Sequence, residues 1–491
     1  MRFFKRGWNE DVFQFGTSGL KNYSKKVRPD GIEDLISMNA LFRPGPMDSR
    51  AHEKFVDIKH GKLEPIYDFK LDKVTENTFG LYIYQEQIMQ AVNVLGKLTL
   101  AEADELRTAI KKFDHKKMQS AKEQFLKGAN ENGCPTDEAN DIWDKLNAFS
   151  AYGFNRSHSA AYSLMGYWCQ YLKVKYPLEF WTASLNFADE KIEIPNRLSE
   201  IEKIGGDIKV KQPDINKSDI KFTADADSSS VYWSLTKIKN VGQIAVQNIL
   251  EEREKNGMFF DLEDFYKRVP KSKVNKRVVQ HLIMAGALDE IGDENGCEIG
   301  EVKQRMHILL RHCELAGHKY IEDFPSEDKN NNNWFWAIKQ RELTGFGYVD
   351  FMPMIRKKSS KLKKYPYTTA KDFELNDFRE GKPWKPETNG TPLTVAGVVQ
   401  GIKVNRTKSN GNYRVVITVE NNNVLLFIGV FGEIWESLSD DFEELLSKKL
   451  LFCINGFALS NKYQKNKNAK GSGNNHLWLN KQSRLIVLND N

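Results

Sequence analysis

The chain has 491 residues, of which 40% are hydrophobic and 11% are aromatic. This composition favours several folded domains over a disordered chain, because a typical domain holds roughly 100–200 residues. No run approaches the ~18 uninterrupted apolar residues of a membrane span, and the basic start of the chain has no apolar segment behind it. We therefore expect a cytoplasmic protein that does not interact with a membrane.

The formal net charge of +6 is modest, but Lys and Arg gather in runs, as at 356–358 and 361–364. Such runs are typical of surfaces that bind polyanions, and they are equally typical of solvated helix faces and linkers. The five cysteines form no C-x-x-C pair, which disfavours a disulfide framework and a four-cysteine zinc site. We assign no metal ligand, because the spacing of the one His/Cys cluster does not place its members on one helix face. That cluster consists of His307, His312, Cys313 and His318.

From about residue 30 to 205 the sequence predicts a succession of capped helices. Thr99, with a glutamate three residues later, predicts a capping box. Ser157 is the expected cap of a later helix, which Pro177 forces to end. We therefore expect a helical domain over residues 1–205.

Residues 206–300 have a different pattern, in which a short β-rich patch precedes two helices, one over 244–255 and one over 275–285. A helix, a tight glycine-containing turn and a second helix form the pattern of a hairpin module. Residues 301–390 contain an asparagine run, basic residues and prolines, and we expect a loosely structured connector there.

The last part of the chain, residues 391–491, predicts five strands with one helix between the third and the fourth. This order is that of an OB barrel, whose first and fourth loops commonly contact single strands. The first loop holds Lys403, Arg406 and Lys408, and we predict that it contacts DNA, although lysine-bearing loops also serve solubility alone. The predicted strands cover residues 394–404, 413–420, 424–431, 450–459 and 476–488, and the helix covers 433–448.

Two groups of basic residues are candidates for binding a triphosphate. Arg107 and Lys111 lie four residues apart on one predicted helix face, with Lys112 adjacent, and such fixed charges hold phosphates in line. Alone, a pair with this spacing is more often ordinary surface. Arg156 and His158 fall at a predicted helix amino terminus, where backbone N–H groups favour a phosphate. An ordinary capped turn with buried aromatic side chains would give the same pattern.

Several long motifs occur in a fixed order. They are Val12-Phe-Gln-Phe15, Arg43-Pro-Gly-Pro-Met47, Tyr84-Gln-Glu-Gln-Ile88, Tyr152-Gly-Phe-Asn-Arg-Ser-His-Ser-Ala-Ala-Tyr162, Pro213-Asp-Ile-Asn216, Lys237-Ile-Lys-Asn-Val-Gly242 and Leu393-Thr-Val-Ala-Gly397. Together they resemble the C-family replicative polymerases, the bacterial polymerase III alpha subunits. The resemblance implies a multidomain protein with mostly α-helical fingers, a helix-hairpin-helix DNA-binding region, a connector and a small OB-fold β-barrel.

The resemblance also implies roles for individual residues. It places Arg107, Lys111, Lys112, Asn155, Arg156 and His158 at the incoming nucleotide, and Arg43, Lys237, Lys239, Val241 and Gly242 at the DNA. The family often has two adjacent arginines where this chain has Arg107 and Thr108, and the following lysines replace only part of that charge because lysine is not a bidentate fork. The family usually has glycine where Asn240 stands, and asparagine tolerates the left-handed turn required there.

In this family a palm domain supplies three aspartates that bind two magnesium ions. No acidic residues match them here, so we predict no catalytic residue in this chain and expect Mg²⁺ to be bound by a separate palm-bearing chain. The expected function is then DNA-directed DNA synthesis from dNTPs on primer–template DNA, with the chain inactive alone. The alternative is a non-catalytic DNA-binding remnant or replisome interaction module.

Two expectations concern partner proteins. The palm-bearing chain should dock near residues 1–50, where Val12, Phe13 and Phe15 would otherwise lack neighbours. A sliding clamp is a further candidate partner. The connector contains no Gln-x-x-Leu-Phe peptide of the kind that binds a clamp, so the sequence does not support this candidate.

Overall fold

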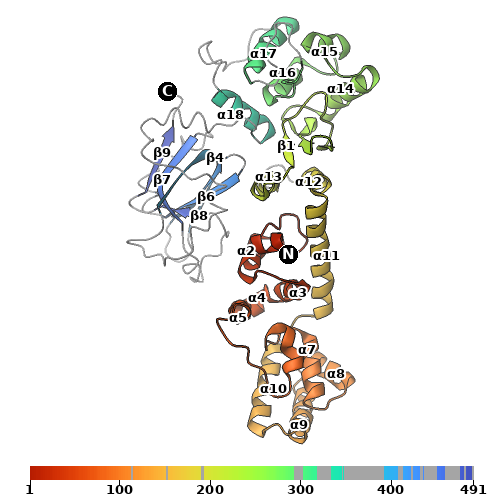
Figure 1. Ribbon diagram of the computed structural model, residues 1–491, viewed down its shortest axis with the longest axis vertical. Helices are drawn as coiled ribbons and strands as arrows, with labels where there is room; N and C mark the ends of the chain where they lie inside the picture. Colours follow the sequence, from red (N-terminus) through yellow and green to blue (C-terminus); the bar gives the residue numbers. More distant parts are fainter. Residues whose placement is uncertain are drawn as a thin grey trace. The chain divides into compact units, whose positions relative to one another are not determined.

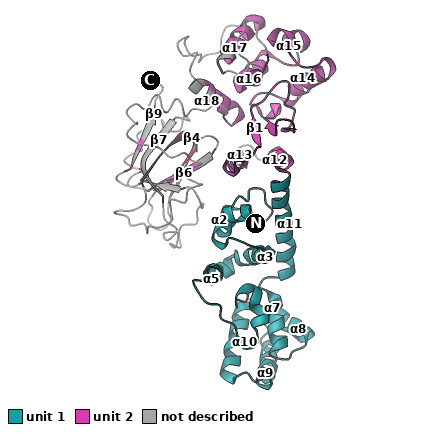
Figure 2. Cartoon of the chain, in the orientation of Figure 1, with its two compact units in different colours: residues 1–175 teal, residues 176–491 magenta. Residues whose placement is uncertain are grey.

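The computed structural model of the chain is shown in Figure 1. It describes residues 1–111, 114–150, 153–188, 193–291, 302–317, 333–345, 347, 392–406, 413–421, 424–431, 435, 450–458, 476–479 and 483–488. These residues fall into two compact units, Met1–Lys175 and Tyr176–Asn491 (Figure 2). Among the described residues, no helix is both long enough and apolar enough to cross a membrane.

The first core of unit 1 joins the amino-terminal helices to one long helix, α11. The elements are α1 (Arg2–Arg6), α2 (Ser18–Val27), α3 (Ile32–Leu41), α4 (Pro44–Asp48), α5 (Ala51–Lys59) and α11 (Arg156–Lys175). A Cβ atom on Gly166 would lie 2.7 Å from the ring of Phe15, so this glycine permits the close approach of α11. Val12 and Phe15 are buried in this core, and the expectation that they lack neighbours is wrong. Phe13 alone of the three is exposed, at 38%.

The second core of unit 1 is a helical bundle. Its elements are α6 (Asp72–Thr75), η1 (Glu76–Thr78), α7 (Gln85–Val94), α8 (Leu100–Lys111), α9 (His115–Glu131) and α10 (Thr136–Ser150). The predicted capping box is confirmed, because the Thr99 N–H donates to Glu102 Oε2 at 2.7 Å and the Glu102 N–H donates to Thr99 Oγ1 at 3.3 Å. Phe125 and Trp143 pack in the centre of the bundle with ring centroids 5.4 Å apart.

Unit 2 begins with helices and a three-stranded sheet that share one core. The elements are α12 (Pro177–Asn186), α13 (Glu193–Ile204), β1 (Lys209–Lys211), β2 (Thr223–Asp225), β3 (Ser230–Tyr232), η2 (Leu235–Lys237), α14 (Gln243–Asn256), α15 (Leu262–Arg268), α16 (Lys276–Ala285), α17 (Val302–Ala316) and α18 (Asn333–Thr344). In the sheet, β3 lies between parallel β1 and antiparallel β2. Trp181 and Leu198, which fall in the range predicted for the first domain, are buried in this core.

Two of these helices lie where we expected a loosely structured connector. Leu309 of α17 and Trp336 and Leu343 of α18 are buried in the same core as the hairpin module, and both helices pack against α16. The asparagine-rich segment next to these helices led us to predict a connector. The apolar side chains of the two helices are covered only in the folded protein, so local composition does not indicate them.

The last part of unit 2 is a six-stranded sheet. Its strands are β4 (Pro392–Arg406), β5 (Tyr413–Asn421), β6 (Val424–Phe431), β7 (Leu450–Ala458), β8 (His476–Trp478) and β9 (Arg484–Leu488). The pairings run β4-β5-β6-β8-β7, and β7 also pairs with β4, so five strands close into a ring. The single strand predicted over 476–488 is instead two strands, of which β8 pairs with β6 and β7, and β9 pairs with β7 alone. The predicted helix over 433–448 lies outside the described residues, apart from Trp435.

Candidate nucleotide and nucleic-acid interface

Two of the sequence motifs meet at the amino terminus of α11. The Phe154 N–H donates to the Ile83 carbonyl at 3.0 Å, and the Gln85 N–H donates to the Phe154 carbonyl at 2.9 Å. Asn155 caps α11, since its Oδ1 accepts from the His158 N–H at 2.8 Å and from Ser157 Oγ at 2.7 Å. The prediction of Ser157 as the cap is therefore wrong. An asparagine has the side-chain carbonyl that this position requires.

Arg156 is held by two carboxylates that the sequence did not indicate. Its guanidinium Nη2 donates to both oxygens of Glu33 at 2.8 and 2.9 Å. Its backbone N–H donates to both oxygens of Glu86 at 3.0 and 2.9 Å. The Glu33 contact joins residues 123 positions apart, so no local pattern could have revealed it. Glu86 lies inside the Tyr84–Ile88 motif, which was the one available signal for it.

The aromatic ring of Phe154 connects Arg43 to the same place. The Arg43 guanidinium lies over the Phe154 ring at 3.7 Å from its centroid, and Arg43 Nε donates to the Asn39 carbonyl at 3.3 Å. Burial lowers the pKa of the Arg43 guanidinium, which remains a cation because arginine is not deprotonated in proteins. His158 packs edge-on against Phe154 at 5.4 Å and stacks on Tyr162 at 4.1 Å.

The structure thus brings four predicted residues together around the start of α11: Arg43, Asn155, Arg156 and His158. Their side chains provide two cations, an exposed imidazole and a capped helix terminus. The Arg156 and His158 N–H groups of this terminus already donate to Glu86 and to Asn155, so the arginine side chains and the imidazole are the groups that can meet an anion.

Arg107 belongs to a different part of unit 1. On α8, its Nε and Nη2 both lie 2.8 Å from Asp104 Oδ1, with the arginine side chain 32% exposed. Arg107 pairs with Asp104 and Arg156 pairs with Glu33, so these ion pairs do not connect the two arginines. Lys111 is the last residue of α8, but its side chain and the whole of Lys112 lie outside what the structure describes.

The turn before α14 has the geometry predicted from the sequence. Asn240 has a φ of 66°, which confirms that this position needs a left-handed residue. The Val241 side chain is buried and its N–H donates to the Ile238 carbonyl at 3.0 Å, so Val241 stabilises the turn. Gly242 is the exposed N-cap of α14, and no side chain caps this helix. The backbone N–H groups that can donate to a phosphate are therefore those of the first turn, which starts at Gln243.

The two predicted lysines both precede Asn240. Lys239 is exposed, and its N–H donates to the Leu343 carbonyl of α18 at 2.8 Å. Lys237 is half-buried at the end of η2. The exposed ammonium group of Lys239 is therefore the better placed of the two for a DNA phosphate.

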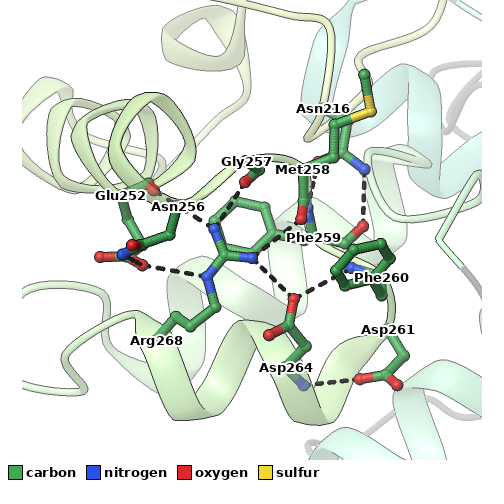
Figure 3. Close-up of polar contacts among 10 residues, drawn as sticks. All are labelled: Asn216, Glu252, Asn256, Gly257, Met258, Phe259, Phe260, Asp261, Asp264 and Arg268. Atoms are coloured by element: carbon green, nitrogen blue, oxygen red, sulfur yellow. Dashed lines mark hydrogen bonds and ion pairs between the residues drawn. The ribbon is translucent and has the colours of Figure 1, made fainter.

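A network centred on Arg268 holds the far end of α14 in place (Figure 3). The guanidinium donates to the carbonyls of Gly257 at 2.7 Å and Met258 at 2.9 Å, and it pairs with Glu252 at 3.1 Å and Asp264 at 2.9 Å. It also lies over a phenylalanine ring, that of Phe259, at 4.4 Å from the centroid. These contacts connect α14, the loop between α14 and α15, and α15 itself. They hold α14 in a fixed orientation within the hairpin module.

Most of the loop residues predicted to contact DNA in the C-terminal sheet lie outside the described residues. Lys403 is an exposed residue of β4. Arg406 is the last residue of β4, its side chain lies outside the described part, and so does all of Lys408. Their contact with DNA stays a prediction.

The described residues contain no group of three or more His, Cys, Asp or Glu side chains that could hold a metal ion. Within the His/Cys cluster noted in the sequence, His312 is buried, and its Nδ1 lies 2.5 Å from the hydroxyl of Tyr266. His318 of that cluster lies outside the described residues.

Two regions of the chain match known protein families. Residues 1–133 match the bacterial DNA polymerase III alpha subunit finger domain, and residues 207–296 match the helix-hairpin-helix motif. The chain is a region of the C-family polymerase III alpha type. It is 31% identical over 459 residues to DNA polymerase III subunit alpha of Aquifex aeolicus, covering 93% of this chain and 37% of that protein.

Two further alpha subunits show the same relationship. The Campylobacter jejuni protein is 39% identical over 82% of this chain and 34% of its own length, and the Escherichia coli protein is 31% identical over 91% and 38%. The chain thus spans between 34% and 38% of these polymerase III alpha relatives.

Proposed function

We propose that this chain supplies the fingers and the DNA-binding part of a replicative DNA polymerase, and that it acts with a separate palm-bearing polypeptide. The observation that supports this proposal is the start of α11, where Asn155 caps the helix next to Arg156 and His158. In the assembled enzyme the palm would hold Mg²⁺, which activates the primer hydroxyl and stabilises the leaving pyrophosphate.

The residues around α11 are suited to receive the incoming dNTP. The Arg156 and Glu33 side chains are 41% and 43% exposed, and an ion pair this exposed contributes only about 0–1 kcal/mol. Replacing the Glu33 carboxylate by a phosphate therefore costs little, and a guanidinium binds phosphate oxygens in pairs. Arg107, in a similarly exposed pair with Asp104, supplies a further cation from α8.

The rest of the chain would grip primer–template DNA. The uncapped first turn of α14 and Lys239 address backbone phosphates, which are the same for every sequence. We further propose that the ring of strands closed by β4 and β7 is an OB barrel, with Lys403, Arg406 and Lys408 directed toward DNA. The domain limits proposed from the sequence are 1–205, 206–300, 301–390 and 391–491, although α12, α13, α17 and α18 contribute to the same core as the hairpin module.

The full chain is expected to bind primer–template DNA with strong salt dependence and little sequence preference. Each neutralised phosphate contributes a slope of about −0.9 to the plot of log affinity against log salt, so raising salt from about 50 to 200 mM should weaken binding at least about 10-fold. Fluorescence anisotropy on duplexes of unrelated sequence measures both effects. Lys239→Gln should reduce the slope by about one phosphate, whereas Lys62→Gln, 68% exposed in unit 1, should not. A flat salt response would contradict the proposed DNA contacts.

Arg107→Ala is expected to impair nucleotide use more than DNA binding. Loss of one charge-assisted contact costs about 1.5–3 kcal/mol, which corresponds to roughly 10- to 100-fold in kcat/KM for the dNTP. Steady-state primer extension by the enzyme reconstituted with its palm measures this ratio. Arg311→Ala is the matched control, because Arg311 is also an exposed helical arginine paired with an acid, at 48% exposure. Parental nucleotide kinetics in Arg107→Ala would remove this residue from the site.

A further inference from the structure

The solvent side of α11 carries an unusual set of side chains. Six large apolar residues between 37% and 55% exposed form what we name the α11 outer face: Leu164, Met165, Tyr167, Trp168, Tyr171 and Leu172. The opposite side of the helix is buried, although most of its side chains are small or polar: Ser159, Ser163, Gly166, Gln170 and Lys173. This reverses the ordinary pattern of a surface helix, which buries its large apolar residues.

Specific contacts fix the helix in this orientation. Ser159 Oγ donates to the Ile36 carbonyl at 2.6 Å, and Lys173 Nζ donates to the Glu10 carbonyl at 2.5 Å. Gly166 lies too close to Phe15 for any larger side chain. Rolling α11 to bury its apolar residues would break these hydrogen bonds and strand a buried ammonium group, so the exposure of the outer face is built into the fold.

The chemistry of the outer face fits a protein partner. Between Ser157 and Val174 the only charged residue is Lys173, which is buried, so this surface offers no charge to a nucleic-acid backbone. Tyr and Trp are the residues most enriched at the centres of protein interfaces. Large contiguous apolar patches are rare on monomeric proteins and mark interaction sites, and the outer face gathers six large exposed apolar side chains, three of them Tyr or Trp, on one side of a single helix. A standard interface buries about 800 Å² per partner, and this patch would form its core.

The outer face extends along α11 toward the end of the helix that carries His158. His158, Met165 and Leu172 follow one another at a spacing of seven and therefore lie along one side of α11. The outer face is thus continuous with the nucleotide-binding end of the helix. A protein that covers it also lies beside the nucleotide, as a palm must, and the relatives carry more than half of their length outside the matched region.

We propose that the α11 outer face is the docking surface of the palm-bearing polypeptide. This inference rests on the proposed function. The partner surface should be apolar and uncharged opposite Trp168, which is the most exposed member of the face at 55%.

The test uses a purified, fluorescently labelled palm-bearing polypeptide from the same genome, titrated with the full chain. Trp168→Ala should weaken binding by about 30-fold, the loss typical of a central interface aromatic residue. Ile66→Ala is the matched control, since Ile66 is an apolar residue of unit 1 that is 69% exposed but lies outside α11, and it should bind like the parent. Circular dichroism melting of both variants verifies that neither side chain is needed for folding.

The outcomes separate this inference from the proposed function. Undiminished palm binding by Trp168→Ala, with DNA synthesis restored in the parent, would overturn the docking site and leave the function intact. A parent chain that neither binds the palm nor gains synthesis from it would overturn the function, and the docking site with it. A parent dimer that Trp168→Ala converts to monomers in light scattering would assign the face to a second copy and overturn the proposal.

Discussion

Mixing the chain with a palm-bearing polypeptide is expected to produce primer extension, and the chain alone is expected to extend no primer. The described residues contain no group of three or more His, Cys, Asp or Glu side chains that could hold a metal ion, and at the α11 site the carboxylates of Glu33 and Glu86 are both bound to Arg156. Bound metal ions contribute several kcal/mol of transition-state stabilisation, so the two preparations should differ by more than about 1,000-fold in rate. Gel analysis of a labelled primer with Mg²⁺ and all four dNTPs measures the difference.

The informative control for this experiment is the palm polypeptide by itself. If the chain supplies the fingers, the palm alone should be far slower than the mixture, and Arg156→Ala in the chain should lower the rate of the mixture. Extension by the purified chain alone, with contaminating polymerases excluded, would contradict the assignment of the metals to a separate palm. A mixture that stays inactive while the chain still binds primed DNA would favour the alternative of a DNA-binding remnant.

Most of the α11 site could be predicted because its residues are close in sequence. Asn155, Arg156 and His158 fall in one motif, and their geometry depends on a single capped helix start. The acidic partners Glu33 and Asp104 were not foreseen. Asp104 lies three residues before Arg107 and could have been found from helical spacing, whereas Glu33 is brought to Arg156 only by the packing of α3 against α11.

The same difference between local and distant contacts explains which parts of the fold could be predicted from the sequence. The capping box at Thr99 and the left-handed turn at Asn240 depend on a few adjacent residues, and both predictions are confirmed. Helices α17 and α18 were missed because their stability comes from tertiary packing rather than from their composition. The final strand was predicted as one segment because apolar alternation does not reveal that β8 joins β6 in parallel before the chain turns to β9.

Replacing Arg305 by methionine is expected to destabilise the hairpin core by about 3–5 kcal/mol, because it leaves a buried carboxylate without its partner. Arg305 of α17 is 0% exposed, and its Nε donates to both oxygens of Asp289 at 2.8 and 2.9 Å. Its Nη2 also donates to Gln212 at 2.9 Å. The ion pair therefore ties α17 to the end of the hairpin module, although α17 falls in the range predicted to be a loose connector.

Native-state hydrogen exchange of the α16 and α17 amides is the suitable measurement, because a chain of several domains does not unfold in one step. Arg311→Met is the matched control on the same helix, because its pairs with Glu263 and Glu314 lie at the surface, where ion pairs contribute little to stability. The double variant Arg305→Met/Asp289→Leu should recover much of the loss, since an apolar pair avoids the desolvation cost of the buried charges. Equal protection in Arg305→Met and Arg311→Met would show that this ion pair does not hold α17 on the hairpin module.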